Sequence, residues 1–326
     1  MLSHSELIDT DGECSSNIPA YPLQVSFATG VYINDKIVIC SGFTNFNDIV
    51  FPQVTKECYQ LEKGADAFEL VYNMENERLF GRSIMIQGNM LVSGGIDFKN
   101  NVLYSGTGEY INHQIGNDTA PRPKIQLPEP IESHSFININ SSISIMAGGV
   151  RTTTWVSNKT HFYNSDTHEW KRGPDLSQGR LYHASGVLID HATGNKHVAV
   201  VGGIGRGTET KFVALNSVEL LLHGENSWTQ GKFEKKIQKQ LKFNFFEGPP
   251  LPKPLVSLEM VSVGFDLIAI GGTETTITLQ PVGSRDLFKL SCTNHTCQWE
   301  TLIQKLFIPR SRFVAIPVPD HFIKCD

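Results

Sequence analysis

The sequence lacks long apolar runs and is sparing in charge. No stretch is long and apolar enough to form a transmembrane helix, so we expect no membrane insertion. The 326 residues carry 33 acidic and 28 basic side chains, and the net charge of −5 argues against nucleic acid as a partner and against an anionic membrane surface. The N-terminus "MLSHSELIDT" also lacks the charged region and apolar core of a signal peptide.

Motifs for nucleotide binding and for catalysis are missing as well. In "HVAVVGGIGRG" (197–207) a dinucleotide fingerprint counted from Gly203 fails at Thr208, and no lysine completes a phosphate loop. No serine lies in a nucleophile elbow, no paired carboxylates recur, and the eleven histidines are scattered. We therefore expect no enzyme and no cofactor.

What the sequence does contain is a repeat. An apolar run closed by a pair of glycines recurs along the chain, with Ser41 replacing the first glycine in the first copy. The second glycines are Gly42, Gly95, Gly149, Gly203 and Gly272, which are separated by 53, 54, 54 and 69 residues. The last step is longer because of an insertion, "QGKFEKKIQKQLKFNFF" (230–246), which we expect to be a solvated loop. Near-equal steps of this size indicate a repeated structural unit of about 50 residues.

Each unit has the same internal order. A polar-apolar strand follows the doublet, then a tryptophan segment in three units (Trp170, Trp228, Trp299), then an outer apolar strand that leads to the next doublet. In the second unit, which has no tryptophan, the last strand is expected near "PRPKIQLPEP". Four strands per unit predict the blade of a β-propeller, with the glycines in a tight turn near the channel and the tryptophan between blades.

These residues resemble Kelch repeats, from about Ser5 to Cys325, most closely in the third to fifth units. The resemblance implies an all-β, six-bladed Kelch-type β-propeller that forms a single domain over residues 1–326. Five blades would be complete. The sixth would be built incompletely from residues 5–25 and 310–325, because its doublet strand is absent. Either the start of the chain has been lost upstream or the ring closes imperfectly.

The six cysteines fall into three candidate disulfides. Cys292 and Cys297 flank a short hairpin, and Cys40 ends one strand while Cys58 begins the next. Cys14 and Cys325 remain, one near each end, where a bridge would clasp the closing blade. The alternative is six reduced thiols in a cytosolic protein. "CTNHTC" also holds His295, but no second Cys/His pair lies nearby, so we expect no metal.

Four acceptor triplets for N-linked sugar lie in expected loops, at Asn117, Asn140, Asn158 and Asn294. Together with the cysteines they predict an extracellular or cell-surface location. In this respect the chain resembles secreted or cell-surface Kelch-like proteins of invertebrates more than cytosolic adaptors.

The resemblance implies a non-catalytic scaffold, expected to be monomeric, that binds a protein or glycan ligand through loops on one face. The candidate loop residues are Phe43, Asn45, Arg82, Arg151, Arg180, Arg206, Arg310 and Arg312. A ring of arginines at a channel mouth could hold an acidic peptide or glycan, although each arginine could instead be a strut between blades. Two alternatives are an intracellular adaptor that recruits a ubiquitin ligase and, less favoured, a galactose-oxidase-like copper enzyme.

Overall fold

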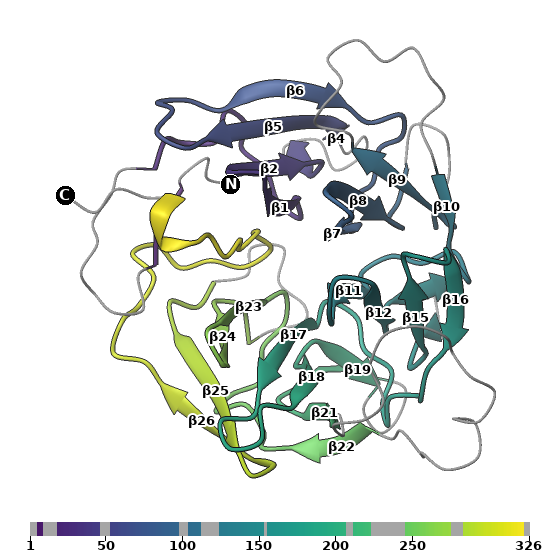
Figure 1. Cartoon of the computed structure of the whole chain (residues 1–326), viewed down its shortest axis with the longest axis vertical. Coiled ribbons are helices and arrows are strands. Elements are labelled where there is room, and N and C mark those ends of the chain that lie inside the picture. The colour runs from purple at the N-terminus through teal and green to yellow at the C-terminus, as the bar shows by residue number, and fades with distance from the viewer. Residues whose placement is uncertain are drawn as a thin grey trace.

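The computed structural model describes residues 5–8, 18–45, 53–97, 104–111, 124–152, 155–206, 211–222, 245–274 and 283–322. These residues form five four-stranded antiparallel sheets arranged around a central axis (Figure 1). Within these ranges, no helix is long and apolar enough to cross a membrane.

The strands of each sheet follow one another from the axis outward. The first sheet contains β1 (Thr29–Ile33), β2 (Lys36–Cys40), β5 (Glu57–Glu62) and β6 (Glu69–Asn73); the second contains β7 (Arg82–Ile86), β8 (Asn89–Ser93), β9 (Thr107–Ile111) and β10 (Lys124–Gln126); the third contains β11 (Ser135–Asn138), β12 (Ile143–Ala147), β15 (Thr160–Asn164) and β16 (Glu169–Arg172); the fourth contains β17 (Ala184–Ile189), β18 (Lys196–Val201), β21 (Val218–Leu222) and β22 (Phe245–Gly248); the fifth contains β23 (Glu259–Val263), β24 (Asp266–Ile270), β25 (Leu287–Thr293) and β26 (Thr296–Thr301). Three small ribbons connect second and third strands: β3 (Phe43–Asn45) with β4 (Gln53–Val54), β13 (Val150–Thr152) with β14 (Trp155–Val156), and β19 (Ile204–Arg206) with β20 (Phe212–Ala214).

In each sheet, the strand that ends at the glycine doublet is the second strand. The strand directly before it lies innermost, which corrects the expectation that this strand is an outer one. β1 lies against β7, β7 against β11, β11 against β17, and β17 against β23, so the first strands of successive sheets line the axis (Figure 1). The repeat predicts that four consecutive strands form one sheet, but it does not show whether the first of them lies at the inner or the outer edge.

The glycine doublets are required by backbone conformation. Both members are left-handed, as at Gly202 (φ +64) and Gly203 (φ +88). A Cβ on Gly203 would lie 2.6 Å from the carbonyl oxygen of Leu181, closer than real Cβ atoms come. Only glycine tolerates both the left-handed φ and the close approach of the Leu181 carbonyl oxygen. The first copy keeps the same conformation with Ser41 at φ 65.

Tryptophans on the outermost strands join neighbouring sheets. On β16, the Trp170 indole donates a hydrogen bond to the Gln126 carbonyl of the preceding sheet (3.0 Å), and on β26 Trp299 donates to the Pro249 carbonyl (2.9 Å).

In the second unit, β10 lies where the sequence placed it. The fourth unit differs, because its outermost strand is β22, which begins inside the insertion rather than at Trp228. Trp228 and most of the insertion lie outside the described residues.

Two predicted disulfides are confirmed, and both join residues that face each other on adjacent strands. Cys40 on β2 pairs with Cys58 on β5, and Cys292 on β25 pairs with Cys297 on β26. Their Cα atoms are 4.1 and 4.0 Å apart. The expected Cys14–Cys325 bridge lies outside the described residues.

Segments from both ends of the chain lie between the fifth and first sheets, where the yellow trace meets the purple one (Figure 1). Phe313, Ala315 and Ile8 pack on β24 and its neighbours, whereas Val314, Ile316 and Val318 pack on the first sheet together with residues 18–25. In the parts of residues 5–25 and 307–322 that the structure describes, regular structure is limited to η3 (Asp320–Phe322).

Candidate functional site

Six residues with left-handed backbones form a ring around one end of the central axis. They are Phe27, Phe80, Ser133, Tyr182, Ser257 and Arg312, with φ between 52° and 63°. The first five come just before β1, β7, β11, β17 and β23. Five backbone hydrogen bonds of 2.8–3.3 Å link them, from Phe27 to Arg312 and onward through Ser257, Tyr182 and Ser133 to Phe80. We call these six residues the mouth ring.

The two kinds of loop favoured by the sequence meet at this ring. The residue before a mouth-ring member bridges the residue after a glycine doublet, as in Ser26–Phe43 and Leu181–Ile204. Connections between second and third strands therefore leave from the same face as connections between sheets. Loops on a rigid scaffold are common binding surfaces, so this face is the natural candidate.

Aromatic side chains fill the centre of the mouth. The Phe27 ring lies 4.5 Å from that of Phe80 and 5.7 Å from that of Tyr182, and Phe80 lies 5.5 Å from Tyr182. All three come from different sheets and remain half-buried. They form an apolar floor to a depression that is also lined by Arg82, Glu259 and Arg312, among others.

Arg312 places a positive charge on this floor. Its guanidinium carbon lies 5.2 Å from the centroid of Phe27, in a cation–π contact. Burial lowers the pKa of Arg312 and the nearby Tyr182 opposes this, but a guanidinium remains charged at neutral pH. Among the described residues, no carboxylate lies within ion-pair distance of it.

Arg82, in contrast, is already neutralised. It donates to Glu259 Oε1 (2.8 Å), which lies on the fifth sheet, and to the carbonyl of His134 (3.2 Å), which directly precedes the third sheet. It therefore acts as a strut around the mouth, although it also lines the depression.

Arg180, expected from the sequence to be a loop residue, is fully buried and cannot contact a ligand, which corrects that expectation. Its guanidinium donates to Glu219 (3.0 Å), to Ser217 and to the carbonyl of Gly202. Arg180 thus ties the connection before β17 to the fourth sheet, and the acceptors named above all lie on or beside strands of that one sheet.

The remaining candidates are spread around the face. Arg151 on β13 pairs with Glu129 (2.6 Å), and Arg206 ends β19 with its side chain exposed. Phe43 and Asn45 lie on β3, and Phe43 bridges Ser26 beside the mouth ring. Arg310 is mostly buried against Glu6.

The sequence interpretation missed that Arg180 belongs to a recurring buried pair. Arg78 with Glu109 (3.8 Å), Arg180 with Glu219 (3.0 Å) and Arg310 with Glu6 (3.4 Å) occupy matching positions, each arginine two residues before a mouth-ring member. Each glutamate also accepts the backbone N–H three residues before its arginine, from Glu75, Ser177 and Phe307 respectively. The signal is present in the sequence as "GEYI", "VELL" and "SELI".

Two histidines beside the ring are structural. His134 Nε2 lies 3.0 Å from Ser93 Oγ, and His183 Nε2 lies 3.1 Å from Ser135 Oγ. Both are fully buried, and desolvation lowers the pKa of each, of His134 to about 3. These neutral imidazoles pack between sheets.

Glu132, which directly precedes the mouth-ring residue Ser133, should make the free energy of unfolding depend on pH. Burial raises its pKa to about 7, although a hydrogen bond from the Ser133 hydroxyl opposes the shift. An unfolded glutamate titrates near pH 4.3, so the protonated side chain favours the folded state, and this contribution is lost as the pH rises from about 4.5 through 7. We expect Glu132→Gln to raise the free energy of unfolding by about 2–3 kcal/mol more at pH 8 than at pH 4.5.

Urea unfolding of both proteins at several pH values measures this difference. The comparison cancels the opposite pH dependence of the buried His134 and His183, which both proteins share. A difference between variant and parent that does not change with pH would contradict the assignment to Glu132.

Three predicted glycosylation positions lie in described loops. Asn294 is exposed at the tip of the β25–β26 hairpin. Asn140 accepts the backbone N–H groups of Ser142 and Ile143 in the β11–β12 turn, and Asn158 donates to the carbonyl of Leu176 (3.0 Å). The geometry favours Asn294 most, and all three stay predictions. Asn117 lies outside the described residues.

Comparison with solved structures identifies the class of fold. One of the structures that match, "Structure of YjhT", superposes with a TM-score of 0.68 at 10% identity and covers 86% of each chain. No family model and no curated protein matches the chain. At this identity the likeness concerns the fold alone. Together with the sheets around one axis, it makes this chain an all-β protein of the β-propeller class.

Proposed function

We propose that the protein is a non-catalytic binding scaffold of the Kelch-repeat type, a single six-bladed domain that takes an anionic ligand at the mouth ring. The observation that carries the proposal is Arg312, a half-buried cation beside an aromatic floor with no carboxylate partner among the described residues. Such a cation gains from a carboxylate, sulfate or phosphate group on an acidic peptide or glycan.

The count of six blades is supported by the six mouth-ring residues. The third-strand glutamates Glu109 and Glu219 have their counterpart in Glu6, which meets Arg310 from the other end of the chain. Residues 5–8 therefore take the place of a third strand in the closing blade, whose first strand would be residues 313–318. This arrangement agrees with a blade assembled from both ends.

The proposed location is extracellular or at the cell surface. The two disulfides support it, because such bonds persist mainly in oxidising compartments. Non-reducing peptide mapping of protein from its native source tests the location. Bridged cysteines with sugar on Asn294 would support it, whereas free thiols and bare asparagines would favour the intracellular adaptor.

Replacing Arg312 with asparagine tests the ligand site, because asparagine tolerates the left-handed backbone at this position. Arrays of acidic peptides and anionic glycans are probed with the full chain, and the best probe is titrated calorimetrically. Charged hydrogen bonds of about 1.5–3 kcal/mol predict an affinity loss of roughly 10- to 100-fold for Arg312→Asn.

Arg172→Asn is the matched control, since Arg172 lies on the outermost strand β16 and pairs with Asp175. We expect its affinity to equal that of the parent. Binding by Arg312→Asn that matches the parent, or a preference for neutral probes, would refute the proposed site.

A further inference from the structure

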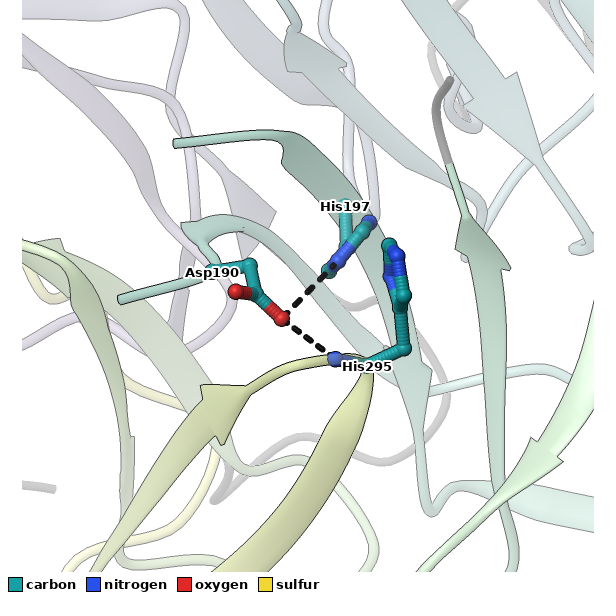
Figure 2. A group of neighbouring side chains, drawn as sticks. All are labelled: Asp190, His197 and His295. Carbon is teal, nitrogen blue, oxygen red and sulfur yellow. Dashed lines mark hydrogen bonds and ion pairs between the residues drawn. The ribbon is translucent and has the colours of Figure 1, made fainter. Parts of the chain in front are cut away.

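A second group of side chains lies away from the channel, where the fourth and fifth sheets meet. Asp190 follows β17, His197 is the second residue of β18, and His295 is at the tip of the β25–β26 hairpin (Figure 2). The mouth ring and the proposed binding function use none of the three.

The carboxylate of Asp190 is held in place by both sheets. Its Oδ1 accepts N–H groups from Ala192 and Thr193 in its own turn, and from Asn294 in the neighbouring hairpin. Its Oδ2 accepts the N–H of His295 (2.6 Å). These four backbone N–H groups fix the carboxylate between the two sheets.

The two imidazoles lie beside each other on the same side of this carboxylate (Figure 2). His197 is fully buried, with its Nε2 3.9 Å from Asp190 Oδ2, and its ring centroid lies 5.5 Å from that of His295 (Figure 2). Asn294 and His295 form a left-handed turn (φ 50° and 63°), which the Cys292–Cys297 disulfide spans. The ligating residues are thus positioned by a strand, a capped turn and a bridged hairpin.

One ligand atom from each residue lies within 4.8 Å of the other two. Zinc with bonds of about 2.0–2.1 Å in tetrahedral geometry needs ligand atoms roughly 3.4 Å apart. The exposed imidazole of His295 would therefore have to move by about an ångström to complete the site. Two imidazoles and one carboxylate suit zinc and related transition metals, and they leave one position open.

We propose that Asp190, His197 and His295 bind one divalent transition-metal ion, with zinc as the best fit. The sequence alone predicts no metal, because beside His295 it offers only Cys292 and Cys297, whose thiols are consumed in the disulfide. The geometry points instead to partners about 100 residues away in the chain. Bound metal would join the fourth and fifth sheets at their outer ends.

Metal titration of the full chain tests this site. Protein treated with a chelator is titrated with Zn²⁺ by calorimetry and with Co²⁺ by visible absorption, which reports the ligand field. We expect one equivalent to bind, and we expect His295→Asn to weaken affinity by at least about tenfold. Asparagine retains the left-handed turn and the backbone N–H to Asp190.

His321→Asn is the control, because His321 also lies beside a carboxylate, Asp35 (2.9 Å), but at a different place in the fold. It should bind as the parent does. Urea unfolding in chelator verifies that His295→Asn folds as stably as the parent. The proposal is overturned if the parent binds no stoichiometric ion, if His295→Asn binds equally well, or if His321→Asn loses as much affinity.

Discussion

Replacing Arg180 with methionine is expected to lower the free energy of unfolding by about 3–5 kcal/mol, because it leaves Glu219 as a buried charge without its cation. Both side chains are almost fully buried, with 1% and 4% exposed. The guanidinium also satisfies the carbonyls of Gly202 and Ser217, which methionine cannot do. Urea unfolding at pH 7 measures the loss.

Arg172→Met provides the comparison. Arg172 pairs with Asp175 on the surface, where 41% of its side chain is exposed, and such pairs contribute about 0–1 kcal/mol. We expect Arg172→Met to unfold within about 1 kcal/mol of the parent. Equal effects for the two variants would show that Arg180 is not a strut between its neighbours.

Gly203→Ala is the second change with a large expected effect. The new Cβ would lie 2.6 Å from the Leu181 carbonyl oxygen and 2.7 Å from His183 Cβ, at a φ of +88. Left-handed strain of about 1–2 kcal/mol and overpacking of about 1–3 kcal/mol together predict a loss of roughly 2–5 kcal/mol. Thermal and urea unfolding measure it.

Gly88→Ala separates the two causes. Gly88 has φ +77, but no atom lies within 4 Å of the position that a Cβ would take there. Only the backbone strain of about 1–2 kcal/mol should remain at this turn. If both alanines cost the same, crowding at the channel is not what requires the second glycine.

The features that the sequence revealed are those encoded within one repeat. Gly203, Trp170 and the Cys292–Cys297 hairpin each depend on neighbours in the same blade or the next, so a period of about 50 residues exposes them. The position of β22 was not predictable in this way, because the insertion moved the outermost strand away from Trp228. The sequence around Trp228 resembles the tryptophan segments of the other units, and for that reason it predicted the outermost strand at the wrong place.

The candidate sites depend on contacts between distant repeats, which one sequence does not reveal. Arg82, Arg180 and Arg312 look alike in sequence, and only the structure separates the two that pair with a carboxylate from Arg312, which has no such partner among the described residues. Glu259 lies 177 residues from Arg82, whereas Glu219 lies 39 residues from Arg180. His295 meets Asp190 across 105 residues, so neither spacing nor motif suggested their pairing.

The contact between Glu6 and Arg310 has a consequence for synthesis of the chain. These residues are 304 positions apart, and translation at about 5–20 residues per second leaves Glu6 waiting roughly 15–60 s for its partner. During that interval, residues 5–8 and the first sheet have no finished neighbour on that side. The nascent ring therefore exposes apolar surface, including Ile8, until the last segment emerges. A chaperone that shields the first blade during this time would act on the step at which the ring closes.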